Sequence, residues 1–373
     1  MGAAAAARPQ QPGNFNASTR QNFVPGPVFN FPAGQTNLTQ TQPIGQTGYG
    51  AAVNILVQGT TTTAAASSTT AANTDYPPPP TNFLKRIRLY NNQNVDLFNV
   101  TGYGLYLWNR VQRTHFDPIT AQVGQFIGGF TPTVFAQYFK APSSIGASAT
   151  DTWAVMYRLC IAWGENLQAG LQLLQDQSVQ YLLELTCGAP SDIYGATTGT
   201  VTTSAVVTTE LEMFSVPPNP ADQPRLNYTQ VVLEDLQMSG FTAGADLVYP
   251  IVPGNILCQV IHELAQGSPL APFSPANLGR LELDYSQVQV PYNPPSSKFS
   301  YFRQRRLYGC DLPPGVLVHE LQAPNGFPEL KGGRDLINLA QLTNANSKIA
   351  IASGAPLTSP QLRTIRTQLA ANR

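Results

Sequence analysis

Apolar and polar residues alternate along much of the chain with a period of two. The clearest run places six large apolar side chains on one face of a single strand: Trp153, Val155, Tyr157, Leu159, Ile161 and Trp163. Because successive side chains of a strand point to opposite faces of the sheet, we expect that face to be deeply buried. The same alternation predicts three more strands, with these inward residues: Val95, Leu97, Tyr103, Leu105 and Leu107; Val179, Tyr181, Leu183 and Leu185; and Val201, Ala205, Val207, Leu211 and Met213.

Two further strands follow from shorter patterns. In residues 83–90 the inward side chains are Phe83, Ile87 and Leu89, while Arg86 and Arg88 point the other way. The apolar run at 231–236 predicts a strand that closes the first domain.

Helical spacing is rarer. It predicts a helix through Ile256, Leu257, Val260, Ile261 and Leu264, with Asn255 as its N-cap and Gly267 just past its end. A short helix is expected over 167–174. A third is expected at 359–371, where Ser359 is the cap, Pro360 takes the first turn, and Leu362, Ile365 and Leu369 share a face.

Two segments have no apolar period. Residues 1–35 contain an Ala run followed by Pro, Asn and Gln, with few large apolar side chains, and are expected to form an arm. Residues 59–80 form a Thr/Ala/Ser tract that ends in four prolines, which predicts a long surface loop. The start of the chain lacks a basic segment followed by an apolar stretch, so we expect synthesis in a cytoplasm.

Chain length and composition indicate two β-rich domains. The chain has 373 residues, of which 42% are hydrophobic, and this exceeds what one core usually organises. Many strands of similar length, joined by turns of Gly, Pro and Asn, are typical of sandwiches of the jelly-roll type. The sequence therefore predicts an all-β fold with a few short helices.

The charge content argues against a nucleic-acid binder. Only 11% of the residues are charged, and 21 basic residues balance 21 acidic ones. Direct binding to a genome needs a basic excess that displaces counterions from phosphates, so we expect no direct sequence-specific nucleic-acid binding. A weakly charged polar surface also lowers the repulsion between identical copies packed side by side, which favours assembly.

Three segments, in order, resemble the major capsid proteins of tectivirus-like bacteriophages, which enclose a membrane inside an icosahedral shell. The first is FLKRIRLYNNQNVDLFNVTGYGLYLWNRVQRTHFDP at 83–118. The second is KAPSSIGASATDTWAVMYRLCIAWG at 140–164, followed by SVQYLLELTCG at 178–188. The third is FRQRRLYGCDLPPGVLVHELQ at 302–322. The tract at 59–80 is an insertion relative to that family.

This resemblance implies a double jelly roll, with two eight-stranded jelly rolls in one chain. The expected parts are an N-terminal arm at 1–35, a first roll at 36–241 that includes the loop 59–80, and a second roll at 242–373 that ends in the helix 359–371. The implied function is a major capsid protein of the virion, whose pseudo-hexagonal homotrimers tile the shell over an internal membrane. Other implied partners are neighbouring trimers, penton and minor membrane proteins, and lipid reached through the termini.

The sequence contains only weak candidates for catalytic or metal-binding residues. His115, His262 and His319 are far apart in the sequence, and after His262 and Glu263 the second ligand position of a zinc-protease motif holds Gln266. Two carboxylate pairs, Glu210 with Glu212 and Glu282 with Asp284, recur at strand spacing about 7 Å apart, as in inverting glycosidases. Such spacing is also ordinary on a solvated strand face. We therefore expect no enzyme, no catalytic, cofactor-binding or metal-binding residues, and no cofactor.

Two basic clusters and four cysteines complete the candidates. Lys85, Arg86 and Arg88, and likewise Arg303, Arg305 and Arg306, could meet lipid headgroups, genome or carboxylates; pairing within or between copies is the favoured interpretation. Cys160, Cys187, Cys258 and Cys310 are scattered singly, as reduced core residues are. The alternative functions are a viral spike or receptor-binding protein, or a carbohydrate-active β-sandwich enzyme.

Overall fold

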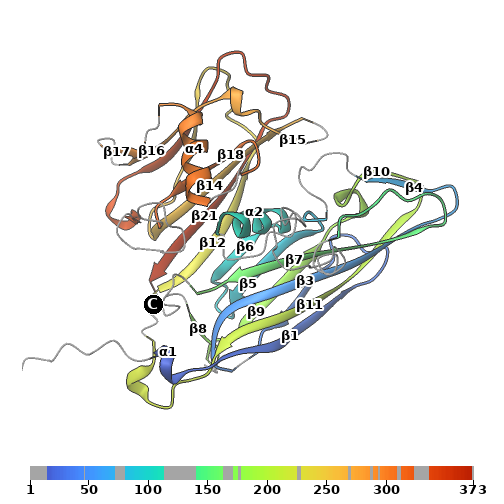
Figure 1. Ribbon diagram of the computed structural model, residues 1–373, viewed down its shortest axis with the longest axis horizontal. Helices are drawn as coiled ribbons and strands as arrows, with labels where there is room; N and C mark the ends of the chain where they lie inside the picture. The colour runs from blue at the N-terminus through green and yellow to red at the C-terminus, as the bar shows by residue number, and fades with distance from the viewer. Residues whose placement is uncertain are drawn as a thin grey trace, which may run out of the picture.

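Two groups of strands fold into two sandwiches that lie side by side (Figure 1). The computed structural model describes residues 15–45, 47–71, 80–112, 140–162, 171–174, 178–224, 228–267, 270–285, 289–292, 295–308, 312–322 and 336–371. None of the helices among these residues has the length and apolar content needed to span a bilayer.

Eight strands form the first sandwich. One sheet has the order β1-β11-β3-β7, and the other contains β2, β9, β5 and β6. The bounds are β1 Gln21–Phe31, β2 Thr39–Pro43, β3 Tyr49–Thr63, β5 Leu84–Asn91, β6 Asp96–Val100, β7 Thr150–Cys160, β9 Tyr181–Cys187 and β11 Val201–Phe214.

Eight strands of the second half repeat this plan. One sheet contains β12, β21, β14 and β18, and the other has the order β13-β20-β16-β17. The bounds are β12 Tyr228–Gln237, β13 Asp246–Pro250, β14 Ile256–Gln266, β16 Leu278–Tyr285, β17 Gln289–Tyr292, β18 Val316–Glu320, β20 Ala345–Ile351 and β21 Gln361–Ala371.

The pairing follows one rule in both halves. In the first half the first strand pairs with the eighth (β1 with β11), the second with the seventh (β2 with β9), the third with the sixth (β3 with β7) and the fourth with the fifth (β5 with β6). In the second half the pairs are β12 with β21, β13 with β20, β14 with β18 and β16 with β17. This is a long hairpin wound into a two-sheet barrel, which is a jelly roll. The predicted fold class is confirmed, and we call the halves the first and second roll.

The remaining elements are short. The helices are α1 Phe15–Ser18, α2 Gly102–Gln112 and α4 Ser297–Tyr308, with 3-10 turns η1 Pro190–Asp192, η2 Pro220–Asp222, η3 Pro275–Asn277 and η5 Leu339–Gln341. The extra strands are β4 Ser68–Ala71, β8 Gln172–Leu173, β10 Tyr194–Thr198, β15 Ala271–Pro272 and β19 Ile337–Asn338. The pair β4 and β10 extends the first roll at one end (Figure 1).

One sheet runs through both rolls. Its order is β15-β14-β21-β12-β6-β5-β9-β2, and the junction is a parallel pair in which Val232 of β12 lies opposite Phe98 of β6. The strand predicted at 231–236 exists as part of β12, but it does not close the first domain, because β12 pairs along its whole length with β21 of the second roll.

Buried aromatic side chains fill the first roll. Trp153, Val155, Tyr157 and Leu159 of β7 are all at most 1% exposed, which confirms the face predicted from alternation. The Phe83 and Trp153 rings lie 4.9 Å apart. Strands are likewise confirmed over 181–187 and 201–214. Trp163 lies outside the described residues.

Gly59 of β3 lies directly under the Trp153 indole, where a Cβ atom would overlap the ring. Gly59→Ala is therefore expected to displace the indole, which donates a hydrogen bond to Thr61 Oγ1 at 3.2 Å. Overpacking of this kind costs about 1–3 kcal/mol of unfolding free energy, measurable by urea denaturation. The matched control is Gly146→Ala, because nothing lies within 4 Å of a Cβ there. Equal transitions for both variants would contradict the expectation.

Both predicted long helices are wrong. Residues 256–266 form β14, and residues 361–371 form β21, with ladder pairing between them. These two strands lie in the middle of the sheet that joins the rolls, so each is buried on both faces. A strand buried on both faces loses its apolar alternation, and its sequence then fits a helical period equally well.

A strand predicted through Tyr103, Leu105 and Leu107 is also wrong, because these residues belong to helix α2. Ten of its eleven residues are buried, since α2 lies between the two rolls (Figure 1). With apolar residues on every side of the helix, alternate positions look like a strand.

The predicted arm and loop contain strands. Residues 21–31 of the supposed arm form β1, and residues 59–63 and 68–71 of the supposed loop belong to β3 and β4. Threonine has a high strand propensity, and Thr61 and Thr203 hydrogen-bond across β3 and β11 at 3.0 Å. Residues 1–14 and 72–79 lie outside the described residues, and so does the first half (167–170) of the helix predicted at 167–174. In its second half Gln172–Leu173 is the short strand β8, so the predicted helix is wrong there.

Candidate functional site

The first carboxylate pair, Glu210 and Glu212, is held in a hydrogen-bonded network on the outer face of the first roll. The Asn54 side chain donates from Nδ2 to Glu210 Oε1 at 3.1 Å and to Glu212 Oε1 at 3.0 Å. Arg158 forms a close ion pair with Glu212. The pair is thus bridged by an amide and compensated by a cation.

Glu282 and Asp284, the second pair, are also ion-paired. Lys348 Nζ lies 2.9 Å from Asp284 and 3.8 Å from Glu282, and Arg280 Nε lies 3.2 Å from Glu282. The hydrogen bond to Asp284 raises the pKa of Lys348, so the cation is retained. Both carboxylate pairs therefore act as cross-strand ties.

Two histidines that are distant in sequence meet inside the second roll. His262 of β14 and His319 of β18 are fully buried with ring centroids 5.9 Å apart, and Ser347 Oγ lies between them, 2.7 Å and 2.8 Å from their Nε2 atoms. Burial lowers the pKa of His262 to about 3, and burial together with the neighbouring ring lowers that of His319. Thr364 Oγ1 bonds His262 Nδ1 at 2.9 Å.

The histidine cluster consists of two imidazoles and the hydroxyl groups that contact them. No group of three His, Cys, Asp or Glu side chains able to hold a metal occurs among the described residues. No sequence pattern indicates this contact, because it depends on the pairing of β14 with β18. His115 lies outside the described residues. We interpret the cluster as a neutral hydrogen-bonded core.

The basic side chains of the first cluster form ion pairs with acidic residues of the same chain. Lys85 forms a close ion pair with Asp192, Arg86 lies 3.4 Å from Glu184, and Arg88 lies 2.5 Å from Asp96. Pairing within the chain, the favoured interpretation, thus holds for this cluster. The second cluster, Arg303, Arg305 and Arg306, lies exposed on α4.

The described cysteines are free thiols. Cys187 and Cys258 are buried, as expected, whereas Cys160 is partly exposed, and Cys310 lies outside the described residues.

A buried polar network joins the two rolls under α2. Arg363 of β21 binds Glu263 of β14 at 3.0 Å and forms a close ion pair with Glu234 of β12. The Tyr103 hydroxyl of α2 makes a close hydrogen bond to Glu263, and Thr101 Oγ1 accepts from Arg363 at 2.8 Å. Every charge in this network has a partner.

Further along α2, neutral hydrogen bonds complete the junction. Trp108 Nε1 donates to Thr367 Oγ1 at 2.9 Å, and Gln112 Nε2 donates to Gln259 Oε1 at 2.9 Å. These contacts fix α2 of the first roll to the outer face of a second-roll sheet.

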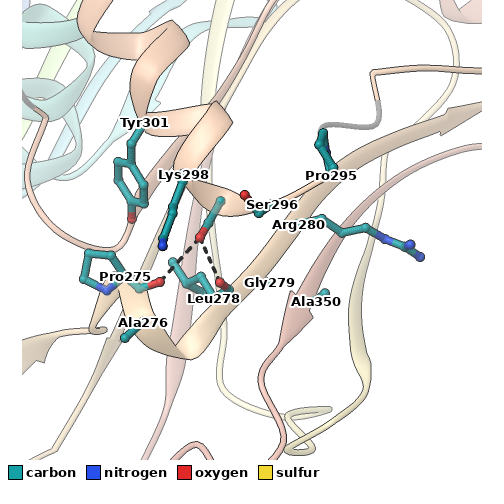
Figure 2. Close-up of a pocket in the computed structure, with 11 residues that line it drawn as sticks. Pro275, Ala276, Leu278, Gly279, Arg280, Pro295, Ser296, Lys298, Tyr301 and Ala350 are labelled. Carbon is teal, nitrogen blue, oxygen red and sulfur yellow. Dashed lines mark hydrogen bonds between the residues drawn. The ribbon is translucent and has the colours of Figure 1, made fainter.

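A cavity of about 530 Å³ opens beside the first turn of α4 (Figure 2). Its lining includes the side chains of Pro275, Leu278, Arg280, Lys298 and Tyr301. Ser297 Oγ donates to the Leu278 carbonyl at 2.9 Å, which holds the helix start against β16. The lining contains no nucleophile paired with a base and no converging carboxylates.

No family model and no curated protein sequence matches this chain. Its fold is nevertheless similar to that of the major capsid protein of Sulfolobus turreted icosahedral virus, with a TM-score of 0.63 and 13% identity over 92% of this chain and 97% of that one. The chain has the double jelly-roll fold. A double jelly-roll chain of the PBCV-1 virus capsid matches with a TM-score of 0.60 and 10% identity over 98% of this chain and 96% of that one.

A third similar double jelly roll is the major capsid protein P2 of bacteriophage PM2. Its TM-score is 0.52, with 8% identity over 95% of this chain and 98% of that chain. All three matches therefore cover both rolls of this chain.

Proposed function

We propose that this chain is the major capsid protein of an icosahedral virus, a structural protein of the virion shell. The observation that carries the proposal is the double jelly roll itself, which extends over nearly the whole length of the chain and of the capsid proteins similar to it. The carboxylates of the two candidate catalytic pairs form hydrogen bonds and ion pairs with side chains of neighbouring strands, which agrees with a structural role.

The assembly unit we propose is a homotrimer. Two similar rolls in one chain give each copy two similar lobes, and three copies in a closed ring give six, which is a pseudo-hexagonal tile. Contacts with penton and minor membrane proteins belong to the same proposal. We also propose that the rolls divide between 214 and 228, because β12 pairs with β21.

One end of the molecule is proposed to face the interior of the virion, where an internal membrane would lie. Both described ends of the chain lie there (Figure 1). Phe15 packs on Tyr49 with ring centroids 5.8 Å apart, Tyr49 pairs with β8, and Gln172 of β8 hydrogen-bonds Thr229 at 3.3 Å, beside Ala370. The opposite end, with β4 and β10, would then face outward.

Light scattering coupled to size exclusion tests the assembly. The chain has a mass of 40.2 kDa, so a trimer of 3 × 40.2 kDa is expected to elute at about 121 kDa. Electron microscopy of larger species should reveal hexagonal tiles. A monodisperse monomer at every concentration up to roughly 100 μM would overturn the proposed trimer, because shell subunits are obligate oligomers.

A further inference from the structure

Helices α2 and α4 occupy equivalent places in the two rolls. Each follows the fifth strand of its roll and precedes the sixth: α2 lies between β6 and β7, and α4 between β17 and β18. Each packs on the fourth and sixth strands of its own roll, which are β5 and β7 for α2 and β16 and β18 for α4. The two helices are therefore counterparts.

Their outer sides differ. The outer side of α2 is covered by the second roll, where Tyr103 contacts Glu263 and Trp108 contacts Thr367. Glu263 lies opposite Arg363 in the ladder, and both point away from the second-roll core, where His262 and Thr364 meet Ser347. The intramolecular contact thus joins α2 to the outer face of the sheet β12-β21-β14.

Among the described residues, the counterpart side of α4 is exposed. Only Ser297, Ser300, Gln304 and Tyr308 are buried, and they form the face on the second roll. On the other face, Phe299 is 53% exposed and Phe302 is 67% exposed. Arg303 and Arg306 continue the same stripe at helical spacing, so an exposed apolar and cationic stripe runs along the helix.

The sheet edges show the same asymmetry. The junction pairs β6, the fifth strand of the first roll, with β12, the first strand of the second roll. The counterpart edges are β17, the fifth strand of the second roll, and β1, the first strand of the first roll. In the part of the chain that the structure describes, β17 pairs only with β16, and β1 only with β11. Both edges are open to another copy.

The outer face of the sheet β1-β11-β3 has a composition that fits α4. The ladder places Phe23 opposite Glu212, Val28 opposite Thr208 and Asn30 opposite Val206, all pointing away from the core that Phe29 and Val207 share. Three apolar side chains on this face are exposed in the isolated chain: Phe23, Val28 and Val206.

Charge adds to the match. Helix α4 carries Lys298, Arg303, Arg305 and Arg306 and no acidic residue. The sheet face presents the exposed Glu210, which accepts a hydrogen bond from Asn54, whereas Glu212 beside it is ion-paired with Arg158. A cationic helix and an acidic strand complement each other across an interface.

We infer that the exposed stripe of α4, together with the β17 edge, binds the outer face and β1 edge of the first roll of a second copy, repeating between copies the contact that α2 and β6 make within one. This deepens the proposed function and rests on it. Because the contact is head to tail, its repetition closes a ring of copies. In this ring the contact between the two rolls of one chain alternates with the contact between neighbouring chains. Phe299 and Phe302 are the central apolar anchors.

The test replaces Phe302, because a polar substitution at so exposed a position leaves the fold of the single chain intact. Phe302→Glu is expected to raise the concentration at which half the chain is trimeric by about tenfold or more, because it replaces a central apolar anchor by a carboxylate on the helix that faces the outer face of the first roll. Circular dichroism should stay unchanged. Val252→Glu is the matched control: Val252 is 60% exposed, but it lies in the loop between β13 and β14.

A second measurement locates the contact directly. A photo-reactive benzoylphenylalanine in place of Phe302 is expected to cross-link another copy within residues 21–31 or 201–214, as identified by mass spectrometry. If the unmodified chain is a trimer, but Phe302→Glu leaves it intact and the cross-links fall elsewhere, this inference is wrong and the proposed function stands. If the unmodified chain is a monomer, the proposed trimer itself fails, and this inference fails with it.

Discussion

Replacing Arg363 by alanine is expected to lower the free energy of unfolding by about 3–5 kcal/mol, the cost of breaking a buried ion network by removal of one partner. Arg363 is the cation between Glu234 and Glu263, whose side chains are 6% and 2% exposed. Without it, two carboxylates would stay buried at the junction of the rolls, within a water-poor space closed by Tyr103. The shift of the urea or thermal transition measures the loss.

Two comparisons separate this network from an ordinary surface pair. Arg280→Ala removes a cation that is 46% exposed and paired with Asp246 and Glu282, so a change below about 1 kcal/mol is expected. Adding Glu234→Gln and Glu263→Gln to Arg363→Ala should recover part of the lost stability, because the uncompensated charges are gone. If Arg363→Ala and Arg280→Ala shifted the unfolding transition equally, the buried ion network would not stabilise the junction of the rolls more than an exposed ion pair does.

Strands with one buried face were predictable from the sequence. In β7 and β11 the inward residues alternate with solvent-facing ones, so the period of two survives. The arginines of β5 likewise marked its outer side, where they pair with Glu184 and Asp96. The two-roll fold was accessible because most strands are of this kind.

Elements at the junction of the rolls were not predictable, for a physical reason. Strand β14 packs on the second-roll core through Val260 and on the first-roll core through Ile261, so its consecutive residues are all apolar or buried. Helix α2 is enclosed in the same way. An apolar period arises in the sequence when one face of a strand or helix is exposed to solvent. At this junction both faces of each element are buried.

The contacts of the candidate residues were predictable only where the two partners lie close together on one strand. Sequence spacing placed Glu210 near Glu212 correctly, yet the Asn54 amide that bridges them belongs to another strand. Nothing local indicates that His262 and His319 meet at Ser347, since three strands must pair and stack before they do. The sequence alone shows the α4 stripe as an arginine cluster, because the apolar spacing of the segment does not indicate a helix.

Acidification between pH 6.5 and pH 4 is expected to destabilise the second roll through His262 and His319. In the unfolded chain both imidazoles take up protons near pH 6.5, whereas burial lowers the pKa of His262 to about 3 and that of His319 well below its ordinary value. The unfolded state therefore binds more protons than the folded state. The contribution of the two neutral histidines to the free energy of unfolding is fully present above pH 6.5 and is lost as the pH falls toward 3. Each histidine contributes a slope of about 1.4 kcal/mol per pH unit in that window.

A variant without the two imidazoles isolates their share of this slope. His262→Gln with His319→Gln keeps side-chain amides near Ser347 and Thr364 but cannot be protonated, so its unfolding free energy should change less between pH 6.5 and pH 5, where carboxylates with ordinary pKa values still remain ionised. Urea transitions at pH 7.0, 6.0 and 5.0 measure both slopes. Parallel slopes in the two proteins would mean that the buried histidines do not control the acid response, because the loss in the native chain comes from protons that only its unfolded imidazoles can bind.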